Sequence, residues 1–168
     1  MRTHDDVIGS IYSLMFRGFY STAFQPIVET GSGCTVGYES LLRGPEDTPL
    51  ANPGRLFNET GYLPEDVRLR LDRACLDSSV RTGRNLPDGV LLFINILGST
   101  IIQLTGVLEE FTGLLDQLHL PPGRIVFEVS ETTSRTMTED LGRAIRLLHR
   151  AGIRVALDDI GVRSPYLY

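Results

Sequence analysis

Four segments with the character of buried strands end on an acid or an amide. Residues 36–39, 91–95, 125–128 and 155–158 end in Glu39, Asn95, Glu128 and Asp158, respectively. The carboxyl ends of parallel strands are the places where α/β folds build their active sites. Because an unpaired carboxylate is costly to bury, these side chains need either a cation or hydrogen-bond donors around them.

Three carboxylates and one amide form the oxygen-rich ligand set that a hard divalent cation such as Mg²⁺ or Mn²⁺ prefers. No lysine ammonium can neutralise them, because all 16 basic residues of the chain are arginines. For any single position a structural role is an equally good interpretation, since Asp often caps a helix and Asn often makes a turn. The same structural role on four successive strands is less expected, so the pattern favours a metal site.

The elements that must position these side chains alternate between strands and helices. The first two strands, at 23–29 and 35–43, flank a Thr30-Gly31-Ser32-Gly33 turn, which predicts an antiparallel hairpin. Beyond it, amphipathic helices alternate with apolar strands, at 64–78, 90–96, 107–118, 125–130, 141–148 and 153–157. This alternation predicts a single α/β domain with a parallel sheet covered by helices.

The composition narrows the classes of function. Hydrophobic residues make up 42% of the chain, enough for a core, and the net charge of -5 argues against a nucleic-acid polymer as partner. No apolar run reaches the ~18–20 residues of a membrane helix, and residues 1–6 are too polar for a signal peptide. Cys34 and Cys75 lack the spacing of a zinc or disulfide motif, so we expect a cytoplasmic protein.

Five short motifs follow one another along the chain. They are Phe24-Gln25-Pro26-Ile27-Val28, Tyr38-Glu39-Ser40-Leu41-Leu42-Arg43, Asn95-Ile96-Leu97, Glu128-Val129-Ser130-Glu131 and Leu157-Asp158-Asp159-Ile160-Gly161. Their order and spacing resemble those of the EAL domain, a family that hydrolyses the bacterial second messenger cyclic di-GMP. The resemblance spans about residues 10–168, which is nearly the whole chain.

The resemblance implies a role for each residue of the predicted site. Glu39, Asn95, Glu128 and Asp158 would ligate one Mg²⁺ or Mn²⁺ ion, and Asp158 together with Asp159 would reach a second. Two metals would activate a water for attack on a phosphodiester phosphorus. Glu39, Asp159 and a supporting Glu131 are therefore the predicted catalytic residues. Arg43 would hold a phosphate of the substrate, and Gln25 would face a guanine edge.

The resemblance also implies a fold, a (β/α)₈ barrel with an antiparallel first strand, which typically needs ~250 residues. Because about five strands are predicted here, we expect an incomplete TIM-like barrel of the α/β class. Residues 1–20 would hold a helix that leads into the domain, and residues 21–168 would form a partial EAL domain. The chain departs from the family pattern at Ser40, which replaces Ala, at Leu97, which replaces Ser, and at Val162-Arg163, which replaces Thr-Gly.

Three functional hypotheses follow. The first is a cyclic di-GMP phosphodiesterase domain that is inactive as these 168 residues, because the family's lysine and later carboxylates are not among them. The second is a catalytically silent EAL-like module that binds a nucleotide or a protein in signalling. The third is an unrelated metal-dependent barrel enzyme with similar strand-end acids. The expected partners are cyclic di-GMP and either a second copy of the chain or an upstream sensor domain.

Overall fold

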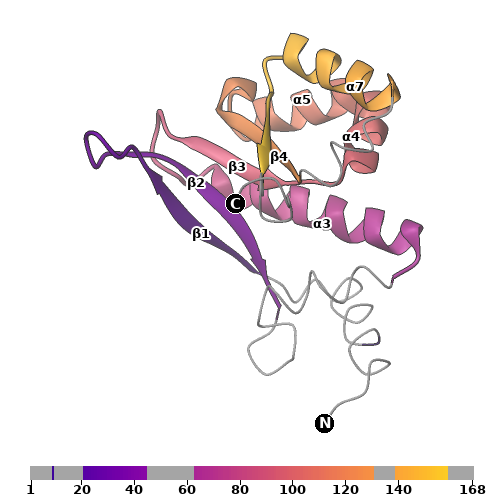
Figure 1. The fold of residues 1–168 in the computed structure, drawn as a ribbon, viewed down its shortest axis with the longest axis horizontal. Coiled ribbons are helices and arrows are strands. Elements are labelled where there is room, and N and C mark those ends of the chain that lie inside the picture. The colour runs from indigo at the N-terminus through magenta and orange to yellow at the C-terminus, as the bar shows by residue number, and fades with distance from the viewer. Residues whose placement is uncertain (1–8, 10–20, 45–62, 131–138, 159–168) are drawn as a thin grey trace, which may run out of the picture.

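The computed structural model describes residue 9 and residues 21–44, 63–130 and 139–158. They form a five-stranded sheet with the order β1-β2-β3-β4-β5 (Figure 1). The strands are β1 (Ser21–Val28), β2 (Thr35–Arg43), β3 (Leu91–Asn95), β4 (Ile125–Ser130) and β5 (Arg154–Asp158). β1 is antiparallel to β2 and the other neighbours are parallel, which confirms the predicted α/β sheet with an antiparallel first strand. Of the helix predicted within residues 1–20, the structure describes only Gly9, which is helical, and the rest lies outside the described residues.

The hairpin of β1 and β2 closes through a tight turn. Gly33 has a φ of 70°, which glycine adopts without strain, and the Glu29 N–H donates to the Cys34 carbonyl at 2.9 Å. The Ser32 hydroxyl also donates to the Glu29 carboxylate at 2.6 Å. Pro26 fits this arrangement because β1 is an edge strand of the described sheet, where a missing N–H is tolerated.

The helices connect the parallel strands and cover one face of the sheet (Figure 1). They are α3 (Glu65–Gly83), α4 (Gly98–Leu104), α5 (Leu108–Gln117) and α7 (Glu139–Arg150), with the short 3-10 helices η2 (Thr105–Val107) and η3 (Pro122–Arg124) between them. α3 begins directly after Pro64, with Glu65 and Asp66 in its first turn, close to the start of the helix predicted over 64–78, and it continues five residues beyond that prediction, to Gly83. α4 was not predicted, because its glycine and β-branched residues are weak helix formers.

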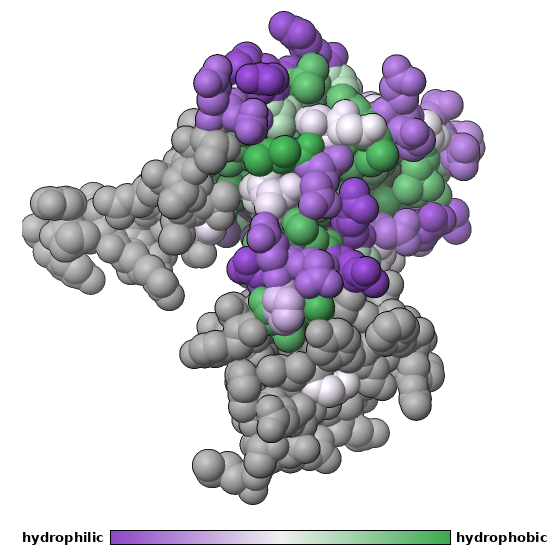
Figure 2. Space-filling view, turned by 90° about the vertical axis from the view of Figure 1, so that its right-hand side faces the viewer, coloured by the Kyte–Doolittle hydropathy of each residue, from purple (hydrophilic) through white to green (hydrophobic). Residues whose placement is uncertain are grey.

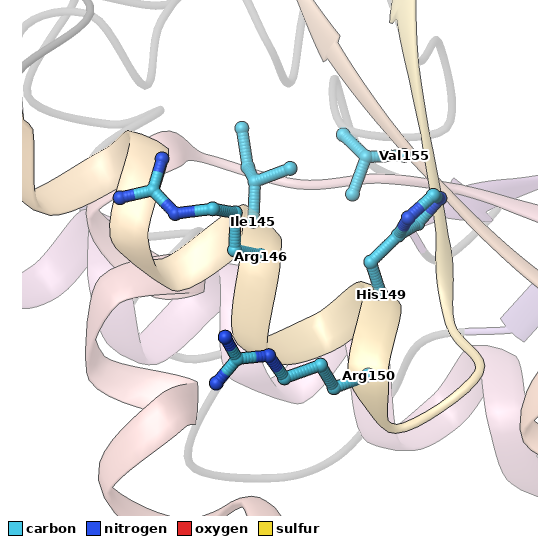
Figure 3. A pocket seen from close by; sticks show the side chains of 5 residues that line it. All are labelled: Ile145, Arg146, His149, Arg150 and Val155. Carbon is cyan, nitrogen blue, oxygen red and sulfur yellow. The ribbon is translucent and has the colours of Figure 1, made fainter.

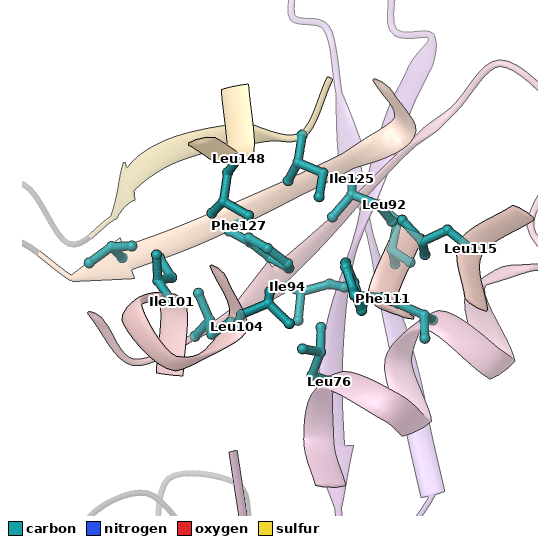
Figure 4. Packing of buried hydrophobic residues seen from close by; sticks show 14 of the residues in the cluster. Leu76, Leu92, Ile94, Ile101, Leu104, Phe111, Leu115, Ile125, Phe127 and Leu148 are labelled. Carbon is teal, nitrogen blue, oxygen red and sulfur yellow. The ribbon is translucent and has the colours of Figure 1, made fainter. Parts of the chain in front are cut away.

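The hydrophobic core fills the space between the sheet and the helices (Figure 4). Leu92 and Ile94 of β3 and Phe127 of β4 are at most 1% exposed, and the rings of Phe127 and Phe111 of α5 lie 6.1 Å apart. Successive side chains of a strand point to opposite faces, so the residues between these core positions face away from the helices. We call that second face of the sheet the inner face.

The two faces differ in how they restrain β2. On the inner face the Phe93 ring covers Gly37, and a Cβ at Gly37 would lie 2.6 Å from Phe93 Cε2 and 2.9 Å from the Leu91 carbonyl oxygen. On the helix-covered face the buried Ser40 hydroxyl donates to the Ser79 hydroxyl of α3 at 2.8 Å. The hydroxyl that distinguishes Ser40 from the family's alanine is therefore satisfied by α3.

The described surface does not gather its apolar side chains in one place. On the face seen in Figure 2, hydrophilic and hydrophobic side chains are interspersed. The exposed large apolar residues are scattered over five elements: Val28, Val36, Ile102, Val107 and Leu157. Among the helices that the structure describes, none is long and apolar enough to cross a membrane.

Candidate functional site

The register of the strands places the predicted metal ligands on the inner face. Asn95 of β3 pairs with Glu128 of β4, and Glu39 of β2 pairs with Phe93, two residues before Asn95. Glu128 in turn pairs with Ala156, two residues before Asp158 of β5. Because residues two apart share a face, all four side chains belong to the inner face near the carboxyl ends of the parallel strands.

Glu39 and Asn95 are in direct contact. The Asn95 side-chain nitrogen Nδ2 donates to Glu39 Oε1 at 2.7 Å, although the two residues lie 56 positions apart in the sequence. Both side chains are partly buried, so the contact holds a carboxylate and an amide together near the carboxyl ends of the parallel strands. Because the Asn95 side-chain nitrogen donates to Glu39, the side-chain oxygen of Asn95 points away from that carboxylate.

Glu128 lies in an unfavourable place for a negative charge. Burial, followed by the negative charges of Glu39 and Asp158, raises the pKa of the Glu128 carboxyl to about 7. Its Oε2 atom is buried and has no hydrogen-bond partner. No ion pair with an arginine of the described ranges compensates Glu39, Glu128 or Asp158. The inner face therefore crowds negative charge around Glu128, and no ion pair of the described residues neutralises it.

The described residues do not by themselves form a complete metal cage. Within residues 21–44, 63–130 and 139–158, no three acids, histidines or cysteines lie close enough together to hold an ion. Asp159 and Glu131, the other predicted carboxylates, lie outside the described residues. The structure thus joins Glu39 to Asn95 and brings Glu128 within electrostatic reach of Glu39 and Asp158, and the ligand set itself stays a prediction.

The predicted substrate-binding residues lie on the same face. Gln25 of β1 is exposed and is the direct cross-strand partner of Glu39, so the two side chains point the same way. Arg43 is four residues beyond Glu39 on β2 and shares its face by the alternation of the strand. Its guanidinium donates to the Leu42 carbonyl at 3.1 Å, through the Nη1 atom.

The pocket in Figure 3 lies elsewhere. It has a volume of about 320 Å³ and is formed between α7 and β5 on the helix-covered side. Its lining side chains are Ile145, Arg146, His149, Arg150 and Val155. None of them is a predicted site residue, and His149 is exposed in the last turn of α7.

One polar residue near the site, Asp72, is not among the residues that the sequence predicts. The Asp72 carboxylate of α3 accepts a hydrogen bond from the Leu97 N–H at 3.0 Å, two residues after Asn95. Asp72 occupies a polar position of an amphipathic helix, where an acid is ordinarily solvated. The sequence therefore carries no local signal that distinguishes it from the other acids of α3.

A comparison with protein families matches residues 15–167 of the chain to the EAL domain. YkuI of Bacillus subtilis, an EAL-domain containing protein, is 26% identical over 149 residues, which cover 86% of this chain and 35% of YkuI. The chain spans about half the length, or less, of the curated relatives that it matches.

Solved structures of three proteins share the fold. YkuI with cyclic di-GMP and calcium superposes with a TM-score of 0.70 and 23% identity, over 96% of this chain and 39% of that chain. Klebsiella pneumoniae BlrP1 with calcium and cyclic di-GMP superposes with a TM-score of 0.73 and 24% identity, over 89% of this chain and 36% of BlrP1. The PaMucR phosphodiesterase with cyclic di-GMP superposes with a TM-score of 0.76 and 19% identity, over 93% of this chain and 64% of PaMucR. The predicted barrel type is thereby confirmed over most of the chain.

Proposed function

Because the chain belongs to the EAL domain family, we propose that its inner face is the metal- and phosphate-binding part of a cyclic di-GMP phosphodiesterase site. Glu39, Asn95, Glu128 and Asp158 hold a divalent cation, and Asp159 extends the site to a second one. Glu131 supports the ligands, Arg43 binds a phosphate and Gln25 faces a guanine. Solved relatives contain cyclic di-GMP with calcium, and one of them is described as a phosphodiesterase.

The crowded charge at Glu128 is the observation that carries this proposal. One of its carboxylate oxygens is buried without a hydrogen-bond partner, and its pKa is raised to about 7 by burial and by the charges of Glu39 and Asp158. A purely structural site would leave such a cost uncompensated, whereas a cation at this position would lower the pKa and give the orphaned oxygen a partner. Carboxylates and an amide oxygen are also the donors that Mg²⁺ and Mn²⁺ prefer.

Different residues of the chain bind different parts of the substrate. A bound cation supplies a water of lowered pKa and neutralises charge on the scissile phosphate. Arg43 offers a permanently charged, planar donor about 13 Å further along β2 than Glu39, at ~3.3 Å per residue. That spacing suits a large substrate with two separated phosphates. Gln25, opposite Glu39, supplies amide donors and acceptors to a base edge.

Turnover by these 168 residues alone is not expected. The resemblance places a lysine beside the attacking water, and the chain contains none. Arginine stays protonated and cannot accept the proton in its place. Loss of a positioned general base typically costs ~10²–10⁴-fold in rate, so we expect binding of the cation and the nucleotide with hydrolysis reduced by at least that factor.

Cation binding is tested by titrating the chain with Mn²⁺ and following free Mn²⁺ by electron paramagnetic resonance. We expect saturable binding that weakens at least tenfold in Glu39→Gln, because a charged oxygen ligand is lost. Glu29→Gln is the matched control, since Glu29 is an exposed acid in the turn of the same hairpin. Equal Mn²⁺ affinities of the wild type and Glu39→Gln would overturn the assignment of the site.

The nucleotide is tested by calorimetry and chromatography. We expect cyclic di-GMP to bind in the presence of Mn²⁺ and to bind at least tenfold more weakly in Arg43→Ala, with Arg81→Ala as a control on the exposed side of α3. Conversion to the linear dinucleotide should be undetectable within hours. Rapid conversion would refute the argument from the absent lysine, and binding of a protein instead of the nucleotide would favour the silent module.

A further inference from the structure

Three successive residues at the end of β3 are each held by a different element. Asn95 donates its side-chain amide to Glu39 of β2, and the Ile96 N–H donates to the Glu128 carbonyl of β4 at 3.0 Å. The Leu97 N–H donates to Oδ2 of Asp72 on α3 at 3.0 Å. Two of these partners are predicted metal ligands, and the third, Asp72, is not.

The contact with Asp72 takes the place of a helix cap. Leu97 is the N-cap residue of α4, and its side chain cannot accept a hydrogen bond from the first turn. In a capping box an acid of the same helix reaches back to the N-cap N–H. Here the acid comes from α3, so a tertiary contact decides where the chain leaves β3 and where α4 begins.

Burying the Asp72 carboxylate costs free energy that its hydrogen bonds must offset. Burial raises the pKa of the Asp72 carboxyl, and the hydrogen-bond donors around it, the Leu97 N–H among them, oppose that rise. An uncharged side chain would fill the same space at less cost. What an acceptor at this position adds is a fixed geometry for the Leu97 backbone, two residues from Asn95.

We propose that Asp72 is a positioning residue of the candidate site, which holds the Asn95–Ile96–Leu97 segment so that the Asn95 amide stays on Glu39. The role in cation binding rests on the proposed function, whereas the orientation of Asn95 does not. Asp72 is not one of the predicted ligands of the cation or the substrate. It acts through the backbone of Leu97.

The orientation of Asn95 is tested first, by nuclear magnetic resonance of its side-chain amide. Its signals are identified as those that vanish in Asn95→Asp. In Asp72→Ala we expect them to move toward the position of a solvated amide and to exchange at least tenfold faster. In Asp72→Asn they should stay near the wild-type position, because the asparagine oxygen can still accept from Leu97. Asp77→Asn, on the exposed side of α3, is the matched control.

Mn²⁺ affinity is the second readout. Loss of a residue that orients a ligand typically weakens metal binding 10–100-fold, so Asp72→Ala should lose about tenfold and Asp72→Asn less than threefold. If the wild type binds no Mn²⁺ while the Asn95 signals respond to Asp72→Ala, the proposed function fails and the positioning role stands. Unchanged Asn95 signals in Asp72→Ala would overturn the positioning role.

Leu97→Pro examines the same hydrogen bond from the other partner, in case Asp72→Ala does not fold. Leu97 has a φ of -74°, which proline shares, so the substitution removes the N–H while keeping the backbone conformation. We expect the Asn95 signals and the Mn²⁺ affinity to change as in Asp72→Ala. Wild-type behaviour of Leu97→Pro would contradict the proposal.

Discussion

Replacing Glu128 with glutamine should make the domain more stable at pH 8 and leave its stability nearly unchanged at pH 4, when no divalent cation is present. The reason is that folding raises the pKa of this carboxyl from 4.5 to about 7. The folded state therefore holds the proton more tightly than the unfolded state does. The stability contributed by protonated Glu128 is present in full below about pH 4.5 and is lost as the pH rises through about 7.

The expected size follows from the shift and from the exposure of the side chain. A rise from 4.5 to about 7 corresponds to about 3 kcal/mol if none of the charge is screened. Glu128 is only partly buried, so solvent screening reduces this by roughly half, and we expect a difference of about 1.5 kcal/mol between Glu128→Gln and the wild type at pH 8. Glutamine keeps the size of the side chain and removes the charge that Glu39 and Asp158 repel.

Urea unfolding followed by circular dichroism between pH 4 and pH 8.5, with a chelator present, measures this difference. Glu110→Gln, an exposed acid in the first turn of α5, should show no comparable gain with pH. Adding Mn²⁺ should stabilise the wild type at pH 8 and should stabilise Glu128→Gln less. A variant that is equal to or less stable than the wild type at pH 8 would refute the electrostatic account of the inner face.

Three further predictions concern packing and thiol chemistry. Gly37→Ala should destabilise the domain by about 1–3 kcal/mol in urea unfolding, because the added Cβ overlaps an aromatic ring and a backbone carbonyl; an unchanged midpoint would contradict this. Ser40→Ala should cost about 1–3 kcal/mol by leaving the Ser79 hydroxyl without its donor, and Ser40→Ala combined with Ser79→Ala should regain most of that loss; additive costs would show that the pair is not coupled. A thiol reagent at pH 8 should modify exposed Cys34 in the native chain and reach Cys75 only after denaturation, since burial and then the Asp72 charge raise the pKa of the Cys75 thiol to about 12; two reactive thiols in the native chain would count against the fold of α3.

Much of the fold was accessible from local patterns. The hairpin follows from two strand segments around a Gly-rich turn, and α3 follows from Pro64 with two acids after it. The strands β3 and β4 were recognisable because they are apolar on both faces, as a sheet covered by helices requires. In each case the signal lies within about ten residues, and tertiary contacts reinforce the local preference.

α4 was missed for the opposite reason. Its seven residues begin with glycine, include β-branched side chains and have no side-chain N-cap, so their local preference for a helix is weak. The carboxylate that accepts from the N-cap N–H belongs to Asp72, 25 residues earlier in the chain. A pattern search along the sequence cannot see a cap that comes from another helix.

In the candidate site, too, the residue types can be predicted from the sequence, whereas the contacts between them depend on the tertiary structure. The types of the residues at the strand ends predict oxygen ligands, and the register of the sheet puts them on one face, but the pairing of Glu39 with Asn95 depends on how far β2 and β3 are staggered. That stagger brings Asn95 to Glu39 and leaves Glu128 among like charges with an orphaned oxygen. In a purely structural site, an arginine beside Glu128 would compensate its negative charge, and the chain contains 16 arginines. The Glu128 carboxyl instead lies among like charges with no ion pair from the described residues, which agrees with the proposal that a bound cation neutralises it.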